Sequence, residues 1–140
     1  MNYPIALAGA IVFLAFLAHV FIGNREAFST RPKSALADDA KAAEIIDRHW
    51  VQSLCAFQLV SIDLFVMAVF LLLLGITDVL SPRRELALAA SGFFALWGAI
   101  WLGQLLVLRR RIGDYLMLGQ WACWFVCAGL LWWGARALER

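Results

Sequence analysis

Four long apolar stretches constrain the fold of this chain more than any other feature. Residues 3–22, 86–108 and 115–135 contain no Asp, Glu, Lys or Arg, and residues 49–77 contain one such residue, Asp63. A helix needs roughly 20 apolar residues to cross the hydrocarbon core of a bilayer. Because the stretches are continuous and do not alternate in polarity, they predict membrane-spanning helices and not the strands of a membrane barrel.

The composition fits the same class of protein. Of the 140 residues, 64% are hydrophobic, whereas soluble domains have roughly 45–50%. We therefore expect an all-α membrane protein, folded as an antiparallel four-helix transmembrane bundle in a single domain over residues 1–140. The expected helices cover about 3–23, 50–76, 86–109 and 115–136. No Lys or Arg precedes the first stretch and no small-residue cleavage site follows it, so we expect a retained helix and not a signal peptide.

One substantial polar segment, residues 24–48, separates the first two expected helices. Pro32 interrupts it, and the sequence SALADDAKAAEIIDR (34–48) that follows contains good helix formers. Ser34 is a suitable N-cap, with acidic residues in the first turn. We expect an amphipathic helix here, either at the cytoplasmic surface of the membrane or continuous with the second span.

The distribution of Lys and Arg predicts the orientation. The loops 24–48 and 109–114 together contain eight basic residues, and the opposite side contains four: Arg83, Arg84, Arg136 and Arg140. Cytoplasmic loops carry the excess of Lys and Arg. Both termini are therefore expected outside and both of these loops in the cytoplasm. A bacterial inner membrane is the expected location, with the lipid bilayer as the first partner and no nucleic acid.

With this topology, every expected helix brings a polar side chain to the cytoplasmic leaflet. These residues form a candidate polar pocket or proton relay, which comprises His19, Asn24, Arg25, Glu26, His49, Gln52, Asp63, Gln104 and Gln120. For His19 we expect hydrogen bonds to Gln104, Gln120 or the Asn24–Glu26 cluster. On the second helix, His49, Gln52 and Asp63 share a sector of about 60° at 100° per residue, whereas Gln58 and Ser61 lie off it.

Asp63 is the only formally charged residue inside the four apolar stretches. An Asp at mid-helix costs about 2.5–3.5 kcal/mol on insertion scales, and each Leu, Ile, Phe or Val returns about 0.3–0.6 kcal/mol. The fifteen such residues between Leu54 and Ile76 outweigh that cost. An Asp there should face the bundle and find a partner or stay protonated. It either handles protons or a ligand, or hydrogen-bonds a neighbouring helix.

The histidines and cysteines give weaker indications. His19 and His49 are weak candidates for the axial ligands of a haem b between two helices. A structural or proton-relay use of His19 is favoured over haem ligation, and His49, at the membrane boundary beside Arg48, is expected to be solvated. The three cysteines, Cys55, Cys123 and Cys127, are expected to pack as small apolar residues. We expect no metal site and no cofactor, with haem or quinone as the alternatives.

Small residues recur every four positions on the third expected helix, at Ser91, Ala95, Ala99 and Gly103. Such a stripe permits close helix packing, within the chain or with another subunit. No catalytic motif is present, so the favoured function is a non-catalytic accessory, assembly or oligomeric membrane subunit, in a homo-oligomer or a larger complex. Two alternatives stay open. One is a small proton-coupled transporter that uses Asp63 and His19, and the other is a haem-, quinone- or lipid-binding redox component.

Overall fold

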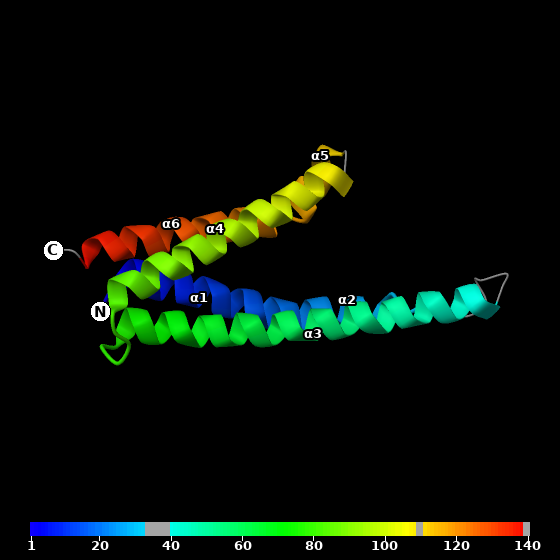
Figure 1. Cartoon of the computed structure of the whole chain (residues 1–140), viewed down its shortest axis with the longest axis horizontal. Helices are drawn as coiled ribbons and strands as arrows, with labels where there is room; N and C mark the ends of the chain where they lie inside the picture. The colour runs from blue at the N-terminus through cyan, green and yellow to red at the C-terminus, as the bar shows by residue number, and fades with distance from the viewer. Residues whose placement is uncertain (33–39, 109–110, 139–140) are drawn as a thin grey trace. The chain divides into compact units, whose positions relative to one another are not determined.

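The chain is helical over almost all of its described length. The computed structural model describes residues 1–32, 40–108 and 111–138, and no strand occurs among them. The helices are α1 (Tyr3–Ala18), η1 (His19–Gly23), α2 (Asn24–Ser29), α3 (Ala40–Ile76), α4 (Arg83–Leu108), α5 (Ile112–Met117) and α6 (Gln120–Ala137), and Figure 1 labels all of them except η1. The expected all-α class is therefore confirmed.

Three continuous helical segments are long and apolar enough to cross a membrane. They are Tyr3–Ser29, which joins α1, η1 and α2, then α3, and then α4. The 18-residue α6 is not among them, because its tryptophans, Gln120 and Arg136 lower its mean hydropathy. The chain thus has the helices of a small membrane protein, with three candidate spans among the described residues.

The helix ends differ from the expected ones on the polar side of the first two spans. The first helix continues through α2 to Ser29, and α3 begins at Ala40, ten residues before the expected start. Residues 40–48, expected to be helical, are therefore continuous with the second span. Residues 33–39 of the expected loop lie outside the described residues, as do 109 and 110 of the loop 109–114. At about 1.5 Å per residue, α3 is about 55 Å long, well beyond the roughly 30 Å hydrocarbon core.

The fourth expected helix is divided into α5 and α6. A turn at Leu118 and Gly119 separates them, and Gly119 is the N-cap residue of α6. The carbonyl oxygens freed at this turn have side-chain donors. The indole of Trp101 donates to Leu118 O at 3.2 Å, and that of Trp121 donates to Tyr115 O at 3.1 Å.

The chain forms two compact units. Unit 1 comprises Met1–Ile11 and Val69–Arg140, and unit 2 comprises Val12–Ala68. In unit 1, α4 packs on α6 through an aromatic cluster. Phe94 is fully buried and stacks on Trp124, with ring centroids 5.8 Å apart, and Trp97 meets Trp124 edge-on at 5.4 Å. Ser91 Oγ of α4 also donates to Ala128 O of α6 at 2.8 Å.

Glycines bring the N-terminal turn of α1 close to the other helices of unit 1. A Cβ on Gly75 would lie 2.6 Å from the backbone nitrogen of Ala6, and one on Gly134 would lie 2.5 Å from Ile5 Cγ1. The close approach permits hydrogen bonds to backbone carbonyls. Asn2 donates from its side-chain amide to Gly134 O at 2.8 Å and from its backbone N–H to Gly75 O at 2.7 Å.

Unit 2 is a pair of helical segments running in opposite directions. The end of α1, with η1 and α2, lies along the first three-quarters of α3 (Figure 1). Contacts follow in reverse chain order, from Phe16 against Phe65, through His19 and Ser61, to Trp50 at the carbonyl of Ala27. This pair positions the candidate site.

Candidate functional site

A π-helical turn interrupts the first helix at the point where polar side chains meet α3. In η1 the backbone N–H of Asn24 donates to His19 O, five residues earlier. A π turn accommodates one extra residue in an otherwise continuous α-helix, and such turns are frequent at functional sites. The turn is in contact with Phe57, because a Cβ on Gly23 would lie 2.7 Å from the Phe57 ring. A side chain at 23 would therefore require the Phe57 ring, which stacks on His19, to shift.

His19, the first residue of this turn, is held by two residues of α3. Its Nδ1 is hydrogen-bonded to Ser61 Oγ at 3.0 Å. Its ring stacks on Phe57, with centroids 3.8 Å apart and the planes 13° from parallel. Ser61 is buried, at 7% exposure, and His19 is half-buried. The imidazole is thereby fixed in both position and orientation, in place of the expected bonds to Gln104, Gln120 or the Asn24–Glu26 cluster.

A second pair of polar side chains follows one turn further along. The side-chain amide of Gln58 donates to Asn24 Oδ1. Both residues are half-buried between the two segments. Together, His19–Ser61 and Asn24–Gln58 make two side-chain hydrogen bonds between helices, and we call these four residues the clasp. In a membrane, polar side chains that hydrogen-bond across helices contribute to helix association.

Beyond the clasp, the contact between α2 and α3 becomes aromatic and charged. The indole of Trp50 donates to Ala27 O at 3.4 Å, and the Phe28 ring meets Trp50 edge-on. The Arg31 guanidinium lies 5.2 Å from the centre of the Trp50 ring and 3.8 Å from an Asp47 carboxylate oxygen. A cation over an indole face is attracted by the ring quadrupole. Tryptophan and arginine are residues that favour the membrane–water boundary.

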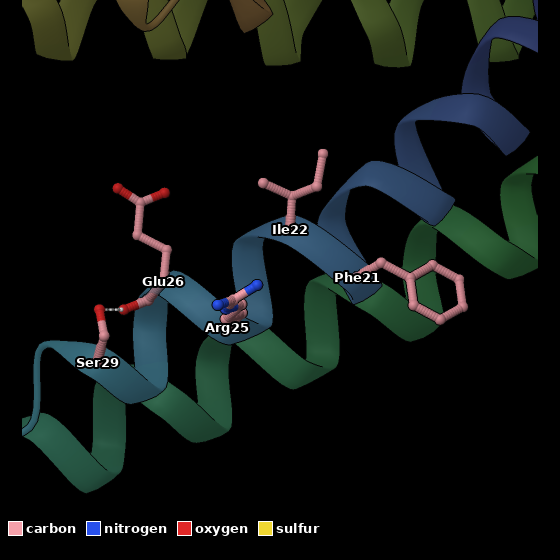
Figure 2. A pocket seen from close by; sticks show the side chains of 5 residues that line it. All are labelled: Phe21, Ile22, Arg25, Glu26 and Ser29. Carbon is pink, nitrogen blue, oxygen red and sulfur yellow. Dashed lines mark hydrogen bonds between the residues drawn. The ribbon is translucent and has the colours of Figure 1, made fainter.

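Arg25 and Glu26, expected at the mouth of a pocket, line a cavity on another side of the helix. This open cavity has a volume of about 360 Å³ and is lined by Phe21, Ile22, Arg25, Glu26 and Ser29. Figure 2 shows the side chains of Ile22 and Glu26 pointing away from α3. Ser29 Oγ donates to the Glu26 carbonyl at 2.6 Å. The two charged residues are therefore separate from the clasp.

His49, Gln52 and Asp63 share an exposed face of α3. Asp63 makes no hydrogen bond or ion pair with any residue in the described part of the chain. At 100° per residue, Asp63 is about 160° around α3 from Ser61, which holds His19. His19 and Asp63 thus belong to different faces of this helix pair.

The other expected site residues lie in unit 1. Gln104 and Gln120 are exposed. Within the small-residue stripe of α4, Ser91 Oγ donates to Ala128 O of α6 at 2.8 Å. Ala95 is half-buried, Ala99 is exposed, and a Cβ on Gly103 would have no atom of the described residues within 4 Å. The buried face of α4 consists instead of Ala87, Ala90, Phe94, Gly98 and Leu105.

The spacing of the two histidines does not suit one haem. His19 lies opposite Ser61, and His49 is twelve residues before Ser61 on α3. Twelve residues correspond to about 18 Å of helix rise, whereas two axial ligands must each reach the same iron. Among the described residues, no group of three or more His, Cys, Asp or Glu side chains is arranged to hold a metal ion.

Phe57, Gln58 and Ser61 are the site residues that sequence reasoning missed. A signal for Phe57 and Ser61 exists in the sequence, because Phe57, Ser61, Leu64 and Ala68 recur at helical spacing on one face of α3. No family model, curated protein or solved structure matches this chain. The clasp, the exposed Asp63 and the apolar helices are thus the observations on which a function can be argued.

Proposed function

We propose that this chain is a non-catalytic integral membrane subunit, with an accessory, assembly or oligomeric role. The single observation that supports this best is the contrast between the two polar faces of α3. On one face the polar side chains pair with the first helix, at His19–Ser61 and Asn24–Gln58. On the other face Asp63 is exposed and has no partner among the described residues. Paired groups stabilise the chain, and the unpaired carboxyl suits contact with another molecule.

In this proposal the complete fold is an antiparallel four-helix bundle, with α6 as the fourth crossing. An 18-residue helix is about 27 Å long, close to the roughly 30 Å of the hydrocarbon core. Both termini face outward and the α2–α3 end lies at the cytoplasmic side of a bacterial inner membrane. The excess of Lys and Arg near that end supports this orientation. The clasp and the cavity lined by Arg25 and Glu26 then lie toward the cytoplasmic leaflet.

The test is site-specific cross-linking in native membranes. A photoreactive residue replaces Leu59, which is 62% exposed on α3, in the full chain. The matched control places the same residue at Leu71, which is fully buried. We expect a discrete intermolecular adduct from position 59 and none from position 71. A 15.6 kDa chain that yields no adduct at 59 and migrates as a monomer from native membranes would contradict the subunit role.

The exposed carboxyl also supports a second candidate, a small proton-coupled transporter that uses Asp63 and His19. An ionisable residue within a membrane span is a candidate for a proton path. The transporter requires a water-filled connection around α3, since the two residues lie on different faces of the helix. Proton flux in vesicles that is unchanged by Asp63→Asn and by His19→Ala would exclude this use of the two residues.

A further inference from the structure

The face of α3 that contains Asp63 has the pattern of a helix-docking surface. Gln52, Ala56, Leu59, Asp63 and Val66 follow one another at spacings of four, three, four and three residues, and all five are exposed. We call them the Asp63 stripe. This alternation is the heptad spacing through which one helix packs lengthwise against another. The stripe rises about 21 Å along the helix, enough for the contact with one transmembrane helix.

The position of Asp63 within the apolar stretch makes its lack of a partner significant. From Leu54 to Ile76 the helix is uncharged except for Asp63. Asp63 lies nine residues after Leu54 and thirteen residues before Ile76. The carboxyl is therefore about 14 Å and 20 Å of helix rise from the two ends of this stretch. Acidic groups at such depth are usually paired with a basic group or face a water-filled cavity. A basic partner would stabilise the ionised carboxylate.

A second copy of this chain has no Lys or Arg to offer at that depth, and its His19 is already held by Ser61 and Phe57 on another face of the helix pair. None of the apolar stretches 3–22, 49–77, 86–108 and 115–135 contains Lys or Arg. In a parallel pair of copies, the group opposite Asp63 would be another Asp63, and two carboxylates at short distance cannot both ionise. Charge complementarity therefore favours a different protein over a second copy.

We propose that the Asp63 stripe docks one transmembrane helix of another membrane protein, and that this helix carries a Lys or Arg at the depth of Asp63. The inference rests on the proposed subunit function and specifies the chemistry of the partner. Apolar side chains of the partner pack beside Leu59 and Val66, and Ala56 leaves room for close approach. The basic side chain of the partner pairs with the Asp63 carboxylate in a medium that strengthens the attraction.

Binding of designed peptides in lipid nanodiscs tests the proposal. The full chain is labelled with a donor fluorophore, and three acceptor-labelled polyleucine transmembrane peptides are compared. They carry a central Lys, no Lys, or a Lys near one end. We expect the central-Lys peptide to bind about tenfold more tightly than the other two, equivalent to about 1.4 kcal/mol. Asp63→Asn should abolish this preference and Asp63→Glu should keep it. Glu44→Gln, an exposed acid of α3 outside the apolar stretch, should leave the preference unchanged.

Three results would overturn the proposal. Equal binding of the three peptides would exclude a charge-specific site, and a preference that survives Asp63→Asn would place the site elsewhere. Self-association of the chain that depends on Asp63 and displaces the peptide would assign the stripe to a second copy. Helical circular dichroism that is unchanged by Asp63→Asn controls for loss of fold.

The peptide experiment and the cross-linking experiment separate the two proposals. If the chain forms no complex in native membranes but prefers the central-Lys peptide, the subunit function is wrong and the chemistry of the stripe stands. If a native complex persists at full yield in Asp63→Asn, the subunit function stands and the Asp63 stripe is not its docking surface.

Discussion

Units 1 and 2 join their helices by different kinds of contact. In unit 2, two pairs of side chains, His19–Ser61 and Asn24–Gln58, hydrogen-bond to each other. In unit 1, the side chains of Asn2 and Ser91 donate to backbone carbonyls, as Trp50 also does in unit 2. At Gly75 the backbones of α1 and α3 come close together, whereas Gly23 of unit 2 faces only the Phe57 ring. Helix association in lipid relies on packing and interhelical hydrogen bonds, because lipid tails remove the hydrophobic driving force between helices. Interhelical side-chain hydrogen bonds and close packing at glycines can therefore be tested separately in the two units.

The largest effect is expected from a single methyl group in unit 1. In Gly75→Ala the new Cβ would lie 2.6 Å from the backbone nitrogen of Ala6, which cannot move by a rotamer change. Such overpacking typically costs about 1–3 kcal/mol, and we expect the upper part of this range. Unfolding by SDS in mixed bicelles measures the change in free energy.

Gly92→Ala is the matched control for that substitution. It lies in α4, and a Cβ there would meet no atom of the described residues within 4 Å. Alanine has the higher helix propensity, so stability should be equal or slightly greater. Similar losses from Gly75→Ala and Gly92→Ala would show that close packing at Gly75 is not what stabilises unit 1.

A smaller loss is expected in unit 2 from the clasp. Ser61→Ala removes the partner of His19 Nδ1 but leaves the stack on Phe57 intact. Interhelical hydrogen bonds in membrane proteins contribute about 0.6 kcal/mol on average and about 1.7 kcal/mol at most. A double-mutant cycle with His19→Phe, which keeps an aromatic ring at 19, isolates this contribution. A coupling energy of zero would contradict the clasp.

Ser53→Ala provides the control for the clasp. Ser53 Oγ donates only within α3, to the carbonyl of His49 at 2.8 Å, and the residue is exposed. Its removal should change stability little and should show no coupling to His19. The comparison thus separates a bond between helices from one within a helix.

The smallest effect is expected at the end of unit 2 where α2 meets the start of α3. Arg31→Ala removes the cation over Trp50 and the contact with Asp47. Exposed cation–π contacts contribute about 0.5–1 kcal/mol, and exposed ion pairs are weakened by salt. We expect a loss within that range that decreases partly in high salt. Arg25→Ala, at an exposed cationic position of α2, should cause less. Equal effects of the two substitutions would show that Trp50 gives Arg31 no special role.

The sequence identifies the apolar spans well and the helix ends poorly. Three of the stretches correspond to candidate spans because hydrophobicity over 20 residues is an additive property of the segment. The polar residues 24–29 and 40–48 extend these helices, and their local composition does not distinguish a surface helix from a continuation of the span. At the break before α6, Trp101 and Trp121 donate to backbone carbonyls, and these pairings are not visible in a local sequence pattern.

The candidate site was harder to predict because it depends on which face of α3 meets the first helix. The sequence pattern predicts that Asp63 faces the bundle and places Gln58 and Ser61 on another face of the same helix. In the structure, Gln58 and Ser61 contact the first helix and Asp63 is exposed. A periodic pattern gives the angle between residues on one helix, but it does not identify the neighbouring helix. Unit 2 supplies that information through contacts between distant positions in the chain.

The π turn has a consequence for comparing this chain with future relatives. Because the turn holds one extra residue between Ala18 and Asn24, a relative with an unbroken α-helix would be one residue shorter in this segment. Its alignment with this chain should show a single-residue gap within 19–23, while the positions equivalent to Asn24 and Gln58 stay matched. Relatives that share the clasp should therefore have a glycine at the position of Gly23 and should align with residues 19–23 without a gap.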